Sequence, residues 1–176
     1  MIGISTNKMN MKKLLYTILI LLISSITVFS QTSTRVELAN KNSVYLIAHA
    51  IEDEFSTGGT RHLFVLTGKN RDYQYIIDII TPFNGDAKEM YKFLRQIQLF
   101  IKQYDKSNGV SKRINGCFVE RVSVFGYGGV DIRTSEGYIQ LTDKNIDDFL
   151  VEFIGYCIVN KLAYKPTPKK RKAQHY

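Results

Sequence analysis

Two histidines and several carboxylates have side chains that can act as acids, bases or metal ligands. His49 and Glu54 lie in one apolar stretch and His62 lies in the next, with glycines between them. If the two stretches pair as a hairpin, Glu54 becomes a near cross-strand neighbour of His62, a spacing that can orient an imidazole or hold a metal. A surface ion pair is the simpler interpretation, because neither a third ligand nor a nucleophile can be identified.

Asp131 is a further carboxylate, and Arg133 shares its face of a predicted strand. Asp131 can act with a neighbouring group as an acid–base pair, or the alternating charges can mark an exposed strand. The sequence contains no nucleophile-elbow, zinc-protease, phosphate-loop or EF-hand pattern. We therefore expect neither a cofactor nor a metal. A site at His49, His62, Glu54 and Asp131 is kept only as a weak alternative.

Tyrosines on or beside predicted strands form the second candidate, a binding surface. A tyrosine ring offers a large contact area with a polar tip, which suits a protein partner or a sugar. The same residues are ordinary strand formers, so plain sheet packing is the alternative. The candidates are Tyr45, Tyr73, Tyr75, Tyr127 and Tyr138.

Cys117 and Cys157 are the only two cysteines. They can form one disulfide, or each can serve as a small buried hydrophobic residue, and the sequence leaves both alternatives open. Their spacing matches neither a redox motif nor a zinc site.

Residues 11–31 read as a secretory signal. Lys12 and Lys13 precede an apolar run at residues 14–23, and small residues at Val28 and Ser30 predict cleavage before Gln31. The alternative is an uncleaved anchor, although the uncharged run is short for a bilayer span of about 20 residues. We expect a secreted or periplasmic protein with a signal peptide at residues 1–30.

The formal charge of +8 belongs to the two ends of the chain. Of the 24 lysines and arginines, three precede residue 31 and five lie in residues 165–176, which leaves 16 basic residues against 16 acidic ones in between. The globular part is therefore formally neutral, and nucleic acid is not an expected partner. Residues 165–176 are predicted to be a disordered basic tail, able to contact a membrane only weakly.

Residues 31–164 are expected to form a single α+β domain. Residues 31–43 show no period and are taken as a leader. Period-two patterns predict strands at residues 44–55, 61–67, 72–80, 116–125, 130–134 and 138–141. Helical spacing predicts helices at residues 86–104 and 144–160. The order β-β-β-α-β-β-β-α, which hints at an internal duplication, predicts a two-layer sandwich with both helices on one face of a largely antiparallel sheet.

These observations favour a small non-enzymatic binding domain. An unknown protein or cell-envelope component is the expected partner, held by an uncovered sheet face or by hairpin loops. The alternative is a small secreted hydrolase that uses a His/carboxylate pair.

Overall fold

The computed structural model describes residues 33–52, 59–73, 78–105, 108–124 and 126–166, which belong to one compact unit, Thr32–Tyr176. Its strands form two antiparallel sheets, each four-stranded. The first sheet contains β1 (Ser33–Lys41), β2 (Val44–Glu52), β3 (Thr60–Lys69) and β4 (Ile79–Gly85). The second contains β5 (Ser111–Ile114), β6 (Cys117–Val124), β7 (Tyr127–Arg133) and β8 (Tyr138–Thr142).

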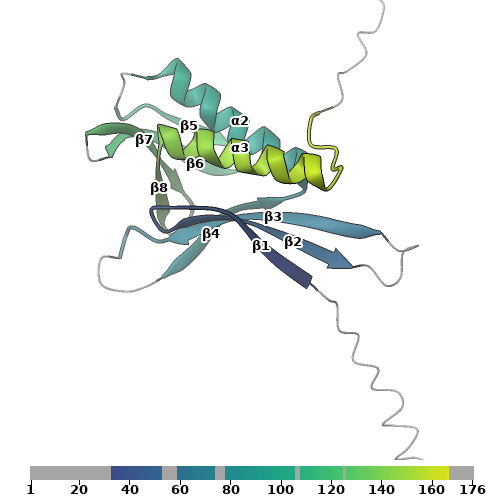
Figure 1. Cartoon of the computed structure of the whole chain (residues 1–176). Helices are drawn as coiled ribbons and strands as arrows, with labels where there is room; N and C mark the ends of the chain where they lie inside the picture. The colour runs from purple at the N-terminus through teal and green to yellow at the C-terminus, as the bar shows by residue number, and fades with distance from the viewer. Residues whose placement is uncertain (1–32, 53–58, 74–77, 106–107, 125, 167–176) are drawn as a thin grey trace, which may run out of the picture. The chain divides into compact units, whose positions relative to one another are not determined.

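A helix follows each sheet: α2 (Ala87–Gln103) after β4, and α3 (Asp143–Val159) after β8. The two halves therefore share one order of elements, four strands and then a helix of 17 residues. Both helices pack on the same face of the first sheet (Figure 1). The predicted α+β sandwich is confirmed, although its strands divide into two sheets. Among the described helices, none is long and apolar enough to cross a bilayer.

Both helices begin at capping boxes. Asp86 Oδ1 accepts hydrogen bonds from the backbone N–H groups of Lys88 and Glu89, at 2.8 and 2.9 Å, and Glu89 Oε2 accepts from the Asp86 N–H. Thr142 and Asn145 make the equivalent exchange at α3. Each box satisfies backbone donors that the first turn of a helix leaves free. The predicted helix starts are therefore correct to within a residue.

The core lies between the first sheet and the helices. Leu46, Phe64 and Leu66 are fully buried on the sheet side. Phe64 meets Phe153 of α3 edge-to-face at 4.8 Å, and Phe83 of β4 stacks on Phe93 of α2 at 4.1 Å. The inner face of the second sheet adds Val119, Ile132 and Ile139 to the same cluster. One continuous apolar core thus joins both halves.

Three strand predictions were wrong. The expected leader contains β1, whose residues 33–37 are all exposed, so that no apolar alternation marks it. Of the strand expected at residues 72–80, residues 74–77 lie outside the described part of the chain, residues 72, 73 and 78 are not in a strand, and Ile79 begins β4, which runs through Pro82. Pro82 is tolerated there because β4 is an edge strand and its pairing with β3 shifts register between Leu66 and Gly68. The strand β5 was not predicted. It ends at Ile114 and is followed by the turn residues Asn115 and Gly116, both of which have positive φ.

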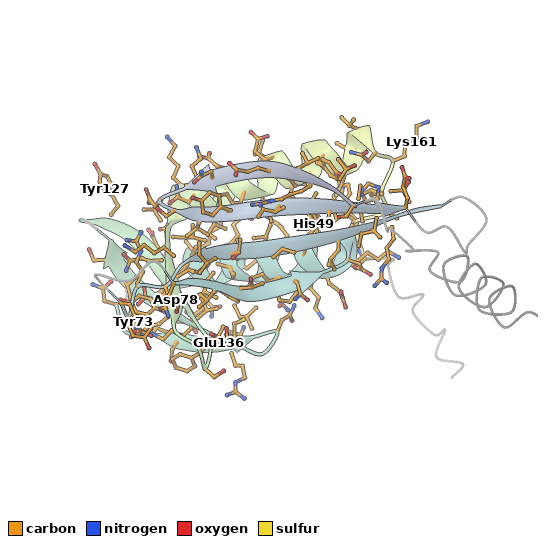
Figure 2. All side chains as sticks on the ribbon, turned by 90° about the horizontal axis from the view of Figure 1, so that it is seen from below. His49, Tyr73, Asp78, Tyr127, Glu136 and Lys161 are labelled. Carbon is orange, nitrogen blue, oxygen red and sulfur yellow. The ribbon has the colours of Figure 1, made fainter. Side chains whose placement is uncertain are left out.

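The segment after β3 joins the two sheets. Arg71 N–H donates to Tyr138 O at 2.9 Å, and the buried Asn70 donates from Nδ2 to Asp78 Oδ2 and to Glu136 O, at 3.0 and 2.9 Å. Figure 2 places Asp78 and Glu136 in the same region. These polar contacts fix the second sheet against the first.

Candidate functional site

The helices cover one face of the first sheet and leave the other uncovered by any described helix or strand (Figures 1 and 2). Along β2, Val44, Leu46 and Ala48 point to the helices and are fully buried. The alternate residues of β2 and their partners on β3 therefore point the other way. We call this surface the open face; on β2 and β3 it consists of Tyr45, Ile47, His49, Ile51, Arg61, Leu63, Val65 and Thr67.

The open face is apolar at its centre and carries balanced charge at its β1 edge. Ile47 and Val65 are cross-strand neighbours, and Glu37 of β1 lies opposite Ile47. Arg35 lies opposite His49 in the next row. Ile47 is only 4% exposed, which shows how closely its neighbours surround it even without a covering layer. The two central strands therefore present half-buried apolar side chains around the buried Ile47.

The structure does not gather the candidate tyrosines on one surface. Tyr45 belongs to the open face, and Tyr73 follows β3 with 49% of its surface exposed. Tyr127 begins β7, and the ring of Tyr138 on β8 lies 4.4 Å from the Arg133 guanidinium. Tyr75 lies outside the described residues. Among these residues, only Tyr45 is part of the open face.

The two histidines point to opposite faces of the first sheet. His62 pairs with Ala50 and His49 with Leu63, so the two imidazoles alternate across the sheet. His62 Nδ1 lies 3.1 Å from the hydroxyl oxygen of Tyr156 on α3, and burial lowers the pKa of this imidazole. Glu54 lies outside the described residues. His49 and His62 therefore belong to different environments.

Asp131 lies in the second sheet, within a polar network. Its carboxylate accepts from Arg133 Nη2 at 2.8 Å and from Gln140 Nε2 at 2.9 Å, and Arg133 Nε also lies 3.3 Å from Glu120. Burial raises the pKa of Asp131, an effect that the bond from Gln140 and the charge of Arg133 partly oppose. Asp131 is 3% exposed, so the strand is not an exposed charged one, and both carboxylate oxygens have partners.

Both cysteines are buried as free thiols. Cys117 Sγ donates to Pro82 O at 3.0 Å, which ties β6 to β4. Cys157 packs in the core on α3, and burial raises its thiol pKa to about 12. In this structure the two residues act as small core side chains. A metal site is not formed either: among the residues described, no three His, Cys, Asp or Glu side chains cluster suitably.

Sequence reasoning missed Arg121, whose side chain is only 2% exposed. All five guanidinium N–H groups have acceptors, because Arg121 bonds to the carboxylate of Asp143 twice and to three backbone carbonyls. The carbonyls belong to Tyr104, Asp105 and Gly129. The sequence does contain a signal for its burial. Arg121 alternates with Cys117 and Val119, so its side chain lies on the same face of the strand as these apolar residues. Arg121 joins the end of α2, β7 and the start of α3.

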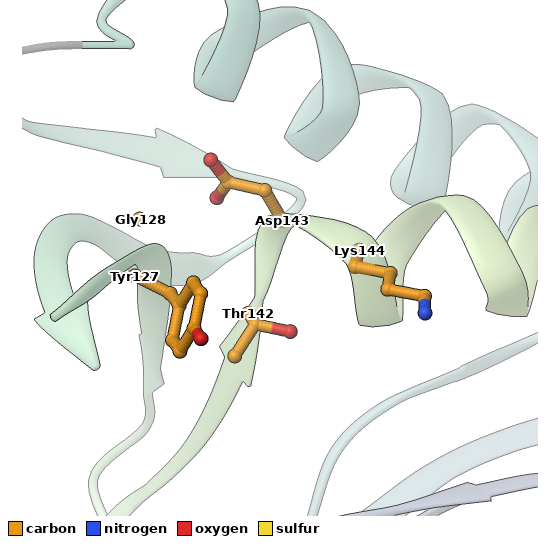
Figure 3. A pocket seen from close by; sticks show the side chains of 5 residues that line it. All are labelled: Tyr127, Gly128, Thr142, Asp143 and Lys144. Carbon is orange, nitrogen blue, oxygen red and sulfur yellow. The ribbon is translucent and has the colours of Figure 1, made fainter. Parts of the chain in front are cut away.

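A cavity of about 550 Å³ adjoins this pair. Tyr127, Gly128, Thr142, Asp143 and Lys144 line it (Figure 3). A Cβ at Gly128 would lie 2.6 Å from Asp143 Oδ2, so the glycine lets β7 approach the ion pair. Because every guanidinium N–H of Arg121 already has an acceptor, Arg121 cannot donate a hydrogen bond to a ligand in the cavity.

No family model, curated protein or solved structure matches this chain. Its function has therefore to be argued from its own surfaces.

Proposed function

We propose that this protein is a secreted or periplasmic, non-enzymatic domain that binds another protein through the open face. The observation that carries the proposal is the one-sided covering of the first sheet, with apolar and aromatic side chains on its other side. An uncovered apolar patch of this kind is typical of an interaction surface.

The charges favour a protein partner with an apolar contact surface. Arg35 and Glu37 offset each other at the β1 edge, and Arg61 on β3 adds a positive charge, so the charges on this face are too few to attract a strongly charged polymer. Ile47, Leu63 and Val65 are held by strand pairing on both sides, and a rigid surface loses little conformational entropy on binding. The alternative, a hydrolase that uses His49 or His62 with a carboxylate, is less favoured, because His62 lies against the Tyr156 hydroxyl and the oxygens of Asp131 are bonded to Arg133 and Gln140.

Site-specific cross-linking tests this proposal. A photoreactive residue at Val65 should trap one partner protein in the cells that secrete the chain, whereas the same residue at Val159, which is 79% exposed at the end of α3, should not. With the purified partner, Val65→Lys should weaken binding by about tenfold or more, because a charge would be buried in an apolar interface. Val159→Lys is the matched control. Cross-links only between two copies, or equal loss in both variants, would contradict the proposal.

A further inference from the structure

A groove of about 410 Å³ runs between α2 and the edge strand β5. Gln96, Leu99 and Gln103 line it from the helix, and Lys112 and Arg113 line it from the strand. Leu99 is 56% exposed, and the buried Phe100 and Ile114 add further apolar lining to the groove. The groove shares no residue with the open face, so it is a second surface.

The outer side of β5 has backbone groups available for another strand. β5 pairs only with β6 in its sheet, through a two-residue turn at Asn115 and Gly116 with φ of 46° and 88°. Such a turn makes Ile114 and Cys117 a hydrogen-bonded pair. The N–H and C=O groups of Ser111 and Arg113 must then point away from β6, toward the groove edge.

The groove also has a definite charge and an unused acceptor. Lys112 and Arg113 are exposed and positive, and no carboxylate lines the groove. Gln96 Oε1 is buried from solvent and has no hydrogen-bond partner within the described part of the chain. A buried acceptor without a donor is costly, so an occupant that supplies an N–H would be favoured.

We propose that this groove binds an extended acidic polypeptide segment, which adds to β5 as a fifth strand of the second sheet. Its backbone pairs with Ser111 and Arg113, and an apolar side chain packs on Leu99. The carboxylates alternate with the apolar side chains, so they share one face of the added strand and lie beside Arg113; Lys112 points to the opposite face of β5 and adds only longer-range attraction. Strand addition between a helix and a sheet edge is a recurring mode of peptide recognition.

Two other occupants fit poorly. Residues 165–176 of the same chain carry five basic residues and no acidic one, so Lys112 and Arg113 would repel them. A second copy pairing through its own β5 would bring four positive side chains together across the new strand pair, which is unfavourable for directly opposed residues. An acidic segment of another protein is the occupant that the charges select.

The probe is a fluorescein-labelled peptide of alternating valine and glutamate, titrated with the full mature chain and followed by fluorescence anisotropy. Replacing its glutamates with lysine should abolish binding, and high salt should weaken it. An N-methylated peptide of the same charge should bind about tenfold more weakly, because each lost backbone hydrogen bond contributes about two- to tenfold. That peptide separates strand addition from simple attraction between charges.

Two variants complete the experiment. Arg113→Ala removes one charge and should weaken binding about threefold, in the range of an exposed ion pair. Arg113→Pro also removes the outward N–H and should weaken it further, while an edge strand tolerates proline at a position that does not bond to its neighbour. NMR shifts on peptide addition should centre on Ser111–Ile114 and the Gln96 amide.

Three results would overturn the proposal. They are no saturable binding of the glutamate peptide, equal binding of the N-methylated peptide, and shifts centred away from β5 and α2. Because the groove shares no residue with the open face, Val65→Lys should leave peptide binding unchanged. This result separates the present proposal from the one for the open face.

Discussion

Replacing Arg121 with methionine tests how far one buried residue holds the two halves together. The side chain makes five hydrogen bonds, two of them to Asp143, with the shorter at 2.5 Å. Methionine keeps much of the volume but leaves Asp143 without its cation and three backbone carbonyls without a donor. The change therefore removes the polar connections and little of the packing.

The expected loss is about 4 kcal/mol in the free energy of unfolding, the cost usually seen when one partner of a buried ion pair is removed. It does not rise to the sum of five bonds, because Asp143 is 30% exposed and water can reach part of its carboxylate. Since small domains are stable by only about 5–15 kcal/mol, this loss is a large fraction of the total.

Urea unfolding followed by circular dichroism measures the effect, with Arg113→Met as the matched control. Arg113 is exposed on β5, so its replacement should change stability by less than about 0.5 kcal/mol. The double variant Arg121→Met, Asp143→Asn should lose less than the sum of the single losses, because the two residues act together. A loss below about 1 kcal/mol for Arg121→Met would refute this reasoning.

Three further predictions follow from single contacts. Gly137→Ala should cost about 2–4 kcal/mol in urea unfolding, because its φ is +141° and a Cβ would lie 2.1 Å from Asn70 Oδ1, whereas Gly59→Ala, with nothing within 4 Å, should be near neutral. Burial raises the pKa of Asp131, so the native state binds the proton more tightly than the unfolded chain does. The free energy of unfolding should therefore fall as pH rises from 3.8 through the raised pKa. Asp131→Asn should remove this pH dependence. Cys157, with a pKa of about 12, should resist iodoacetamide until denaturant is added, and rapid labelling of the native protein in mass spectra would contradict its burial.

The sequence predicted the elements that carry their own local signal. The spacing of Met90, Phe93, Leu94 and Ile97 identified α2, and of the two candidate capping residues, Asn84 and Asp86, the structure uses Asp86. The alternation over residues 44–55 predicted a strand, and its described part, residues 44–52, is β2, which is paired on both edges. Periodicity and capping need no knowledge of distant segments, which is why these predictions were confirmed.

The missed elements and contacts depend on the rest of the chain. β1 is exposed along residues 33–37, so its strand character comes from pairing with β2 rather than from a pattern of its own. The turn residues Asn115-Gly116 were a usable signal for β5, whereas nothing local reveals that Pro82 sits at a register shift. Arg121 finds its acceptors on three other segments, and no single-sequence pattern specifies those partners.

Strand order within the two sheets has a consequence for how the chain reaches its native state. Each strand pairs with the one next to it in sequence, from β1 to β4 and again from β5 to β8. Pairing between sequence neighbours closes short loops, which favours fast folding. If the chain is exported unfolded, as a secreted protein with a signal peptide commonly is, the hairpins of the first sheet can pair before the second sheet has emerged. The apolar face of that sheet is completed only when α3 arrives, because Phe153 packs on Phe64 and Tyr156 reaches His62.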